Sequence, residues 1–120
     1  MADRMLFITW AEPVRGREER SLEVFNEAIG MYGRMQQDGR IEGFDVTLLA
    51  PSMDIAGFIA VRGSAEQMAA LREDEEYLRN MIDASLCVDS LRVCEGYSGA
   101  EVARQMTMYQ DAIAKVPQMA

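Results

Sequence analysis

Residues 44 to 63 read FDVTLLAPSMDIAGFIAVRG and contain two short runs, FDVTLLA and GFIAVRG, that are typical of β-strands. Proline and glycine occur in the connection from 51 to 57, so the stretch predicts an antiparallel hairpin with a long loop. A strand that is covered on one side alternates apolar and polar residues, but LLA and FIAV are apolar in both phases. We therefore expect a second surface to cover the outer face of this hairpin.

Two further strands and three helices surround the hairpin. Residues 5 to 12 (MLFITWAE) and 91 to 97 (LRVCEGY) have strand composition. Apolar residues at spacings of three and four predict a helix from about 17 to 37. An S-x-x-Q capping box at 64 to 67 starts a second helix, which the charged run at 72 to 76 interrupts. An S-x-x-E box at 98 to 101 starts a last helix, 99 to 116, whose apolar stripe needs a surface to pack on.

The elements follow the order βαββαβ, with the last helix appended. The two halves of this order repeat each other, each leading from a strand through a helix to another strand. Two right-handed βαβ units joined by a hairpin form a split, ferredoxin-like antiparallel sheet with strand order 4-1-3-2 and both helices on one face. We expect a single α+β domain over residues 1 to 120, with its core at 5 to 97.

Alternation along the strands assigns residues to the two faces of the sheet. We expect these residues beneath the helices: Leu6, Ile8, Trp10, Phe44, Val46, Leu48, Ile59, Val61, Leu91 and Val93. We expect these on the open face: Phe7, Thr9, Ala11, Asp45, Thr47, Leu49, Phe58, Ala60, Arg62, Arg92 and Cys94. Monomeric proteins rarely expose such an apolar centre, so we expect a cover over it. A second copy of the chain could pack sheet to sheet, and the last helix could cover its own sheet or grip the partner.

Composition excludes several functions. Twelve basic and twenty acidic residues give a net charge of −8, which disfavours nucleic acid and anionic membranes as partners. No apolar run approaches a membrane span, so we expect a cytoplasmic protein. The chain has no histidine, which removes histidine triads, HExxH zinc sites and proximal-histidine haem sites, and we expect neither metal nor cofactor. Cys87 and Cys94, seven residues apart, are interpreted as small core residues.

Five residues are candidates for ligand binding: Thr9, Trp10, Tyr32, Asp45 and Arg92. Trp10 is the sole tryptophan and could stack on an aromatic ligand, although an indole also serves as core packing. Tyr32 could place its hydroxyl in a pocket or lie at a rim. Asp45 and Arg92 lie on opposite edge strands of the predicted sheet, so we predict an ion pair between them only across a two-fold interface. No catalytic residue is assigned.

The element order, together with the segment LREDEEYLRNMI at 71 to 82, resembles the dimeric α+β barrel superfamily over residues 5 to 97. That superfamily includes cofactorless monooxygenases, small-lactone isomerases, EthD-like proteins and YCII-like proteins. The resemblance implies pairing through the sheets and a small molecule held either between the sheet and the helices or inside the barrel. The histidine-dependent activities have no counterpart here. We therefore expect a homodimer that binds a small apolar organic ligand or serves in assembly. The alternative is a cofactor-independent monooxygenase or isomerase acting on an aromatic or polyketide-like molecule.

Overall fold

The computed structural model describes residues 2–51, 54–117 and 119. Its elements are β1 (Arg4–Trp10), α1 (Glu18–Gln37), β2 (Gly43–Leu48), β3 (Gly57–Gly63), α2 (Ala65–Glu73), α3 (Glu75–Ser85), β4 (Arg92–Tyr97) and α4 (Ala100–Ile113). The predicted order is confirmed, and the predicted interruption of the second helix separates α2 from α3. Residues 52 and 53 of the predicted hairpin connection lie outside the described part of the chain.

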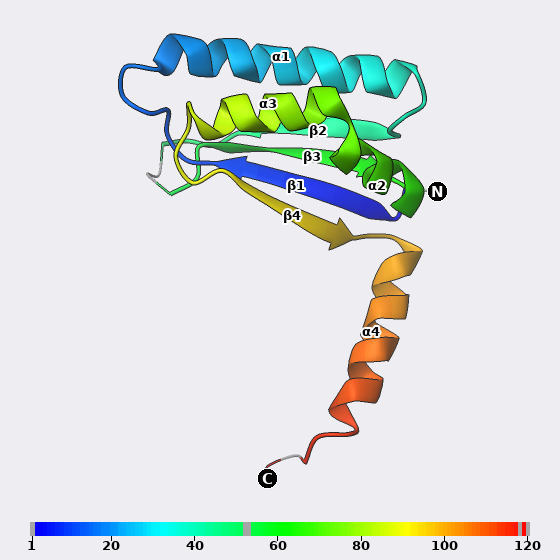
Figure 1. Cartoon of the computed structure of the whole chain (residues 1–120). Helices are drawn as coiled ribbons and strands as arrows, with labels where there is room; N and C mark the ends of the chain where they lie inside the picture. The colour runs from blue at the N-terminus through cyan, green and yellow to red at the C-terminus, as the bar shows by residue number, and fades with distance from the viewer. Residues whose placement is uncertain (1, 52–53, 118, 120) are drawn as a thin grey trace.

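The four strands form one antiparallel sheet in the order β2-β3-β1-β4 (Figure 1). In this register Leu6 of β1 lies opposite Val61 of β3 and Glu95 of β4. β3 lies between β1 and β2, so the strands of the first βαβ half are not neighbours, as the split arrangement requires. The predicted sheet topology is confirmed.

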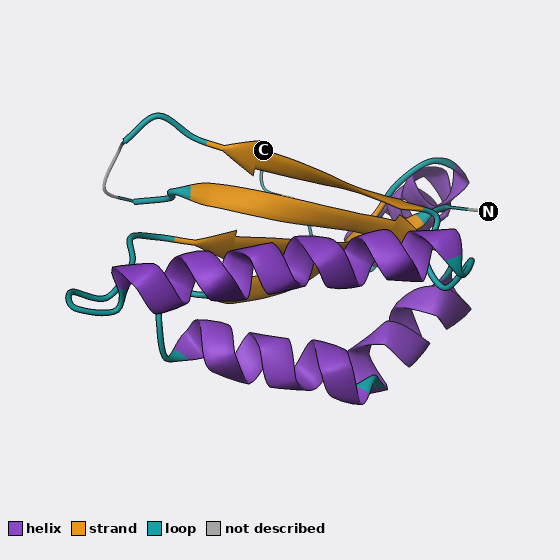
Figure 2. Ribbon diagram, turned by 90° about the horizontal axis from the view of Figure 1, so that it is seen from above, coloured by secondary structure: helices purple, strands orange, loops and turns teal. Residues whose placement is uncertain are grey.

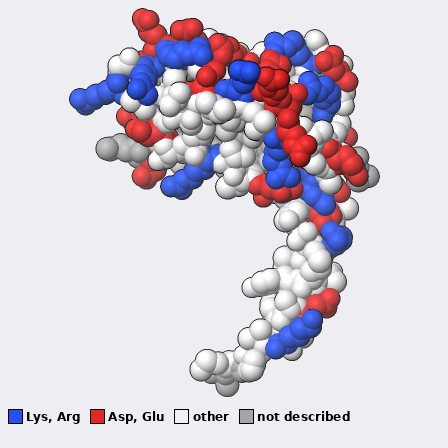
Figure 3. All heavy atoms as spheres, viewed as in Figure 1, with Lys and Arg blue, Asp and Glu red and all other residues white. Residues whose placement is uncertain are grey.

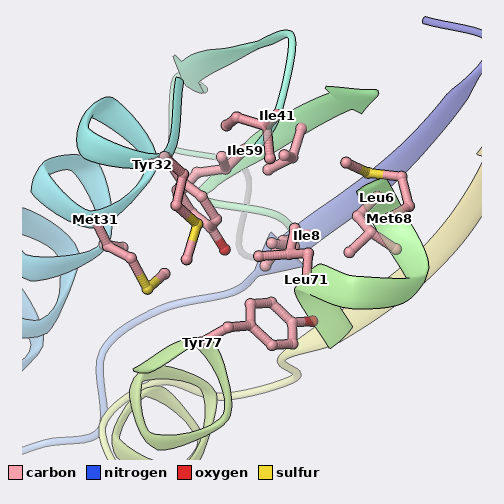
Figure 4. Packing of buried hydrophobic residues seen from close by; sticks show 12 residues of the cluster. Leu6, Ile8, Met31, Tyr32, Ile41, Ile59, Met68, Leu71 and Tyr77 are labelled. Carbon is pink, nitrogen blue, oxygen red and sulfur yellow. The ribbon is translucent and has the colours of Figure 1, made fainter. Parts of the chain in front are cut away.

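One face of the sheet is covered by α1, α2 and α3 (Figure 2). Strand residues Leu6 and Val61 belong to one core cluster with Tyr32 of α1 and Met68 of α2, and all four are almost fully buried. Figure 4 shows Leu6, Tyr32 and Met68 in this cluster. The predicted assignment of alternate strand residues to the two faces is therefore confirmed in the middle of the sheet. Val93 lies opposite Ile8 on this face, yet it is 40% exposed because β4 is an edge strand that the helix layer leaves partly uncovered.

Polar caps explain where α2 and α3 begin. The predicted box at Ser64 is present: the Ser64 hydroxyl accepts from the Gln67 amide at 3.1 Å, and Gln67 Oε1 accepts from the Ser64 amide at 2.8 Å. Asp74 caps α3 by accepting from the Tyr77 amide at 3.0 Å, and it also meets Arg40 at 2.5 Å. Burial alone would raise the pKa of Asp74, but these hydrogen bonds outweigh it and hold that pKa below its usual value.

The second predicted capping box is wrong. Gly99, with φ +56°, precedes α4 as its N-cap residue, and no side chain in the described part of the chain caps this helix. The Glu101 carboxylate, which the box assigned to the helix start, instead bonds Arg104 at 2.6 Å and lies 3.3 Å from Arg4 of β1. A tertiary ion pair has thus replaced the local cap.

The other face of the sheet has no helix over it among the described residues (Figure 1). Phe7 of β1 and Phe58 of β3 lie at its centre, with ring centroids 4.9 Å apart. The same register places Thr9, Asp45, Arg62 and Arg92 on this face. We call it the open face, and its predicted composition is confirmed along the paired strands.

Candidate functional site: a cavity between the sheet and the helices

A cavity of about 280 Å³ lies between the sheet and the helices α1 and α3. Its floor is formed by Ile8, Ile59 and Tyr32, which are at most 4% exposed. Leu22 of α1 and Leu48 of β2, which are 61% and 68% exposed, form part of its rim. The cavity therefore leads from solvent to the buried core, and its walls are mostly aliphatic and aromatic.

Trp10 and Phe25 supply an aromatic wall. Their ring centroids lie 5.7 Å apart at an interplanar angle of 61°, which is the edge-to-face geometry that aromatic pairs prefer. Gly57 lies directly opposite Trp10 in the sheet, and a Cβ at Gly57 would come within 2.9 Å of the indole. The indole can lie over β3 because this position carries no side chain.

Two buried polar groups interrupt the apolar lining. Asn80 of α3, 8% exposed, donates its side-chain amide to the Val24 carbonyl of α1 at 3.2 Å. A carbonyl only accepts, so the side-chain nitrogen Nδ2 faces Val24, and the amide oxygen Oδ1 takes no part in this bond. Burial raises the pKa of the Tyr32 phenol well above its usual value, and Tyr77 adds to the rise. The phenol therefore stays protonated at neutral pH and cannot act as a base.

The five residues predicted from the sequence fall into two groups. Trp10 and Tyr32 both line the cavity, one at its aromatic wall and one at its floor. Thr9, Asp45 and Arg92 lie on the open face, on the other side of the sheet. The structure therefore does not bring all five together at one site.

Asp45 has a partner within its own chain. Its carboxylate forms an ion pair with Arg62 of the adjacent strand β3, and both side chains are largely exposed. Asp45 and Arg92 lie on opposite edge strands, as the sequence predicted. The predicted contact between Asp45 of one copy and Arg92 of another stays a prediction.

Sequence reasoning missed part of the wall that α3 and the following loop contribute, above all Asn80 and Ala84. Asn80, Met81, Ala84 and Cys87 line the cavity from this side. The available signal was the spacing of Tyr77, Asn80 and Ala84, which places a polar amide on the apolar side of a helix. Cys87 is buried as expected, but the core interpretation of Cys94 is wrong, because Cys94 is exposed on the open face of edge strand β4.

Two negative findings apply to the described residues. They contain no group of three or more histidine, cysteine, aspartate or glutamate side chains placed to hold a metal ion. Nor do they include a helix whose length and apolar character would let it cross a bilayer.

No family model matches the chain, and no curated protein matches its sequence. Solved structures do resemble it. A dimeric ferredoxin-like protein of unknown function from Jannaschia sp. CCS1 has a TM-score of 0.61 at 10% identity, over 79% of this chain and 99% of that one. A dimeric protein of unknown function and ferredoxin-like fold from Bacteroides fragilis gives 0.59 at 11% identity, over 79% and 96% of the two chains.

SnoaB from Streptomyces nogalater, a cofactor-independent oxygenase, has a TM-score of 0.50 at 15% identity, over 82% of this chain and 94% of that one. Identities this low establish a shared fold and no shared chemistry. The chain thus has the ferredoxin-like α+β fold, which it shares with proteins described as dimeric, and it matches no family model.

Proposed function

We propose that the protein is a homodimer that binds one small, apolar organic molecule in the cavity of each subunit. The cavity itself is the observation that carries this proposal. Its volume of about 280 Å³ is close to the lower end of the range for small-molecule sites, roughly 300 to 1,000 Å³. That space would hold on the order of nine waters, and mostly apolar walls would offer those waters few hydrogen bonds. A ligand of similar size with an aromatic ring would displace them favourably.

Asn80 supplies the expected selectivity. Its Nδ2 is committed to Val24, so a ligand that carries a hydroxyl or N–H group can donate to the remaining Oδ1. A ligand of the same shape without a donor would leave this buried acceptor unpaired, which costs about 1 to 3 kcal/mol. We therefore expect a planar ring with one donor, such as a phenol, to bind more tightly than the bare hydrocarbon.

The open face supports the homodimer. Phe7 and Phe58 form an aromatic pair at the centre of a sheet face that carries no helix among the described residues. A second copy would bury this face by sheet packing. The exposed free thiol of Cys94 on the same face agrees with a reducing, cytoplasmic setting. In this arrangement the cavities lie on the outer side of each sheet, so each subunit keeps its own site.

Calorimetric titration with 2-naphthol, and with naphthalene as the donor-free comparison, tests the site. Ala84→Phe places a ring in the cavity, whereas Ala69→Phe adds the same ring on an exposed part of α2 outside it. We expect saturable binding of 2-naphthol, weaker binding of naphthalene, and at least a roughly tenfold loss in Ala84→Phe alone. Equal affinity in wild type and Ala84→Phe, or no saturable binding, contradicts the proposal.

A cofactor-independent oxygenase is the second candidate. SnoaB has this activity and shares the fold, and an apolar cavity with an aromatic wall would suit a ring substrate that reacts with oxygen. Native mass spectrometry of freshly purified protein would identify a carried ligand. Consumption of that ligand together with dissolved oxygen favours the oxygenase, and unchanged ligand favours simple binding.

A further inference from the structure

The last helix, α4, stands away from the rest of the molecule (Figure 1). It leaves the end of β4 and runs off on the side of the sheet opposite α1 and α3. Glu101, in its first turn, is its single buried residue. The radius of gyration of the chain is 17.1 Å, compared with about 14 Å for a compact domain of this length. α4 is therefore an arm that the described residues of the core leave uncovered.

The arm carries an apolar stripe that the described residues leave largely exposed. Three residues at spacings of four and three form it: Val102, Met106 and Tyr109. Their exposed fractions run from 45% to 62%. A helix of 14 residues is only marginally stable alone in water, so its stability depends on packing this stripe. Uncharged atoms dominate the arm, in contrast to the charged helix layer (Figure 3).

The root of the arm is held in a fixed direction. The Glu101 side chain is 7% exposed and lies 3.3 Å from Arg4, whose guanidinium in turn stands 5.3 Å from the centroid of the Tyr97 ring. The Ser98 amide donates to the Asp3 carbonyl at 3.1 Å. Gly99 turns the chain with a positive φ that other residues rarely adopt. These contacts fix where α4 leaves β4, and from there the helix runs away from its own sheet (Figure 1). We therefore expect the surface that covers the stripe to belong to another molecule.

We propose that α4 is an arm that grips the second copy of this chain, across the interface that the two open faces form. This inference rests on the proposed homodimer. Packed sheets lie about 10 Å apart, whereas a 14-residue helix spans about 21 Å. The arm is thus long enough to pass the partner's sheet and reach its helix layer. By two-fold symmetry each subunit gives one arm and receives one.

The charge of the arm is compatible with a second copy of the chain as its partner. α4 contains two acidic residues, Glu101 and Asp111, and one basic residue, Arg104. Lys115 follows the helix, so the arm together with the turn after it, residues 100 to 117, has a formal charge of zero. The whole chain has a net charge of −8, and an acidic arm would be repelled by an acidic copy. A neutral arm with an apolar stripe approaches such a partner without that penalty.

Photo-crosslinking tests the arm directly. Tyr109→p-benzoylphenylalanine places the crosslinker on the stripe, and Thr107→p-benzoylphenylalanine places it off the stripe on the same helix. We expect irradiation to yield a covalent two-chain product from the variant at 109 and much less from the variant at 107. Crosslinks confined to a single chain at 109 would show that α4 covers its own sheet, and would overturn the proposal.

Charge variants supply an equilibrium readout. Met106→Glu with Tyr109→Glu puts two charges on the stripe, and Ala103→Glu with Thr107→Glu adds the same charge off it. We expect the first pair to raise the dimer dissociation constant about tenfold or more in sedimentation, and the second pair to leave it within about threefold. If the wild type is a dimer and the stripe variant has the same dimer dissociation constant, the proposal that α4 grips the partner is contradicted, whereas the proposed homodimer is not. If the wild type is a monomer, both proposals fail.

Discussion

Gly57→Ala probes the cavity wall with one added carbon. A Cβ at Gly57 would lie 2.7 Å from the Thr47 carbonyl oxygen, 2.9 Å from Trp10 Cζ2 and 3.2 Å from Leu48 Cδ2. The first of these neighbours is backbone of the paired strand β2, so the strand itself must shift. Overpacking of this kind costs about 1 to 3 kcal/mol.

A cost of about 2 kcal/mol lowers the melting temperature of a domain of this size by roughly 6 to 10 °C. Thermal unfolding at one fixed protein concentration measures the shift, since association changes the apparent stability. Trp10 is the sole tryptophan, so its emission reports the same displacement of the wall. The change in emission should appear in the folded state of Gly57→Ala at 25 °C.

Gly33→Ala is the matched control. Gly33 lies inside α1, and a Cβ there meets no heavy atom within 4 Å. Alanine in a helix interior is favoured over glycine by about 1 kcal/mol, so this variant should melt a few degrees higher. The reasoning is refuted if Gly57→Ala melts at or above the wild-type temperature with unchanged tryptophan emission.

Three further outcomes are expected. Asp74→Ala removes the N-cap of α3, so urea titration should show a free energy of unfolding lower by about 1 kcal/mol. The neighbouring change Glu73→Ala should have little effect. Equal effects of the two changes would contradict the capping role of Asp74. The lowered pKa of Asp74 adds stability above its unfolded pKa of about 3.9, and this is lost as pH falls through the folded value. Glu101→Gln should weaken the dimer by freeing the arm. Hydrogen bonds from Gln105 and Arg104 lower the pKa of Glu101, so the dimer should also weaken in acid as that carboxylate protonates, which sedimentation at stepped pH would detect. Arg92→Glu should weaken the dimer, and adding Asp45→Arg should restore it. If the double variant does not recover, the predicted ion pair between Asp45 of one copy and Arg92 of the other is contradicted.

Periodicity in the sequence was sufficient to predict the fold. Alternation along β1 separates Leu6 and Ile8 from Phe7 and Thr9, and the structure places these pairs on opposite faces. The Ser64 box predicted the start of α2 because both its partners lie within one turn. Local patterns succeed where the interactions that decide an element are themselves local.

Features that depend on distant residues were not predicted. Glu101 satisfies the local pattern of a capping box, but Arg4, nearly a hundred residues earlier, lies beside its carboxylate. Asn80 shares a cavity with Trp10 only after α3 has packed over the sheet. Cys87 and Cys94 were both interpreted as core residues, yet Cys87 is buried and Cys94 is exposed. Tertiary packing decides each of these cases.

The central claim is that the open face and the α4 arm are covered by a second copy of the chain. Sedimentation equilibrium of the unmodified protein at micromolar concentration tests it most directly. The account predicts a soluble species with twice the mass of one chain that dissociates only on dilution. A stable species with the mass of one chain throughout that range would contradict it.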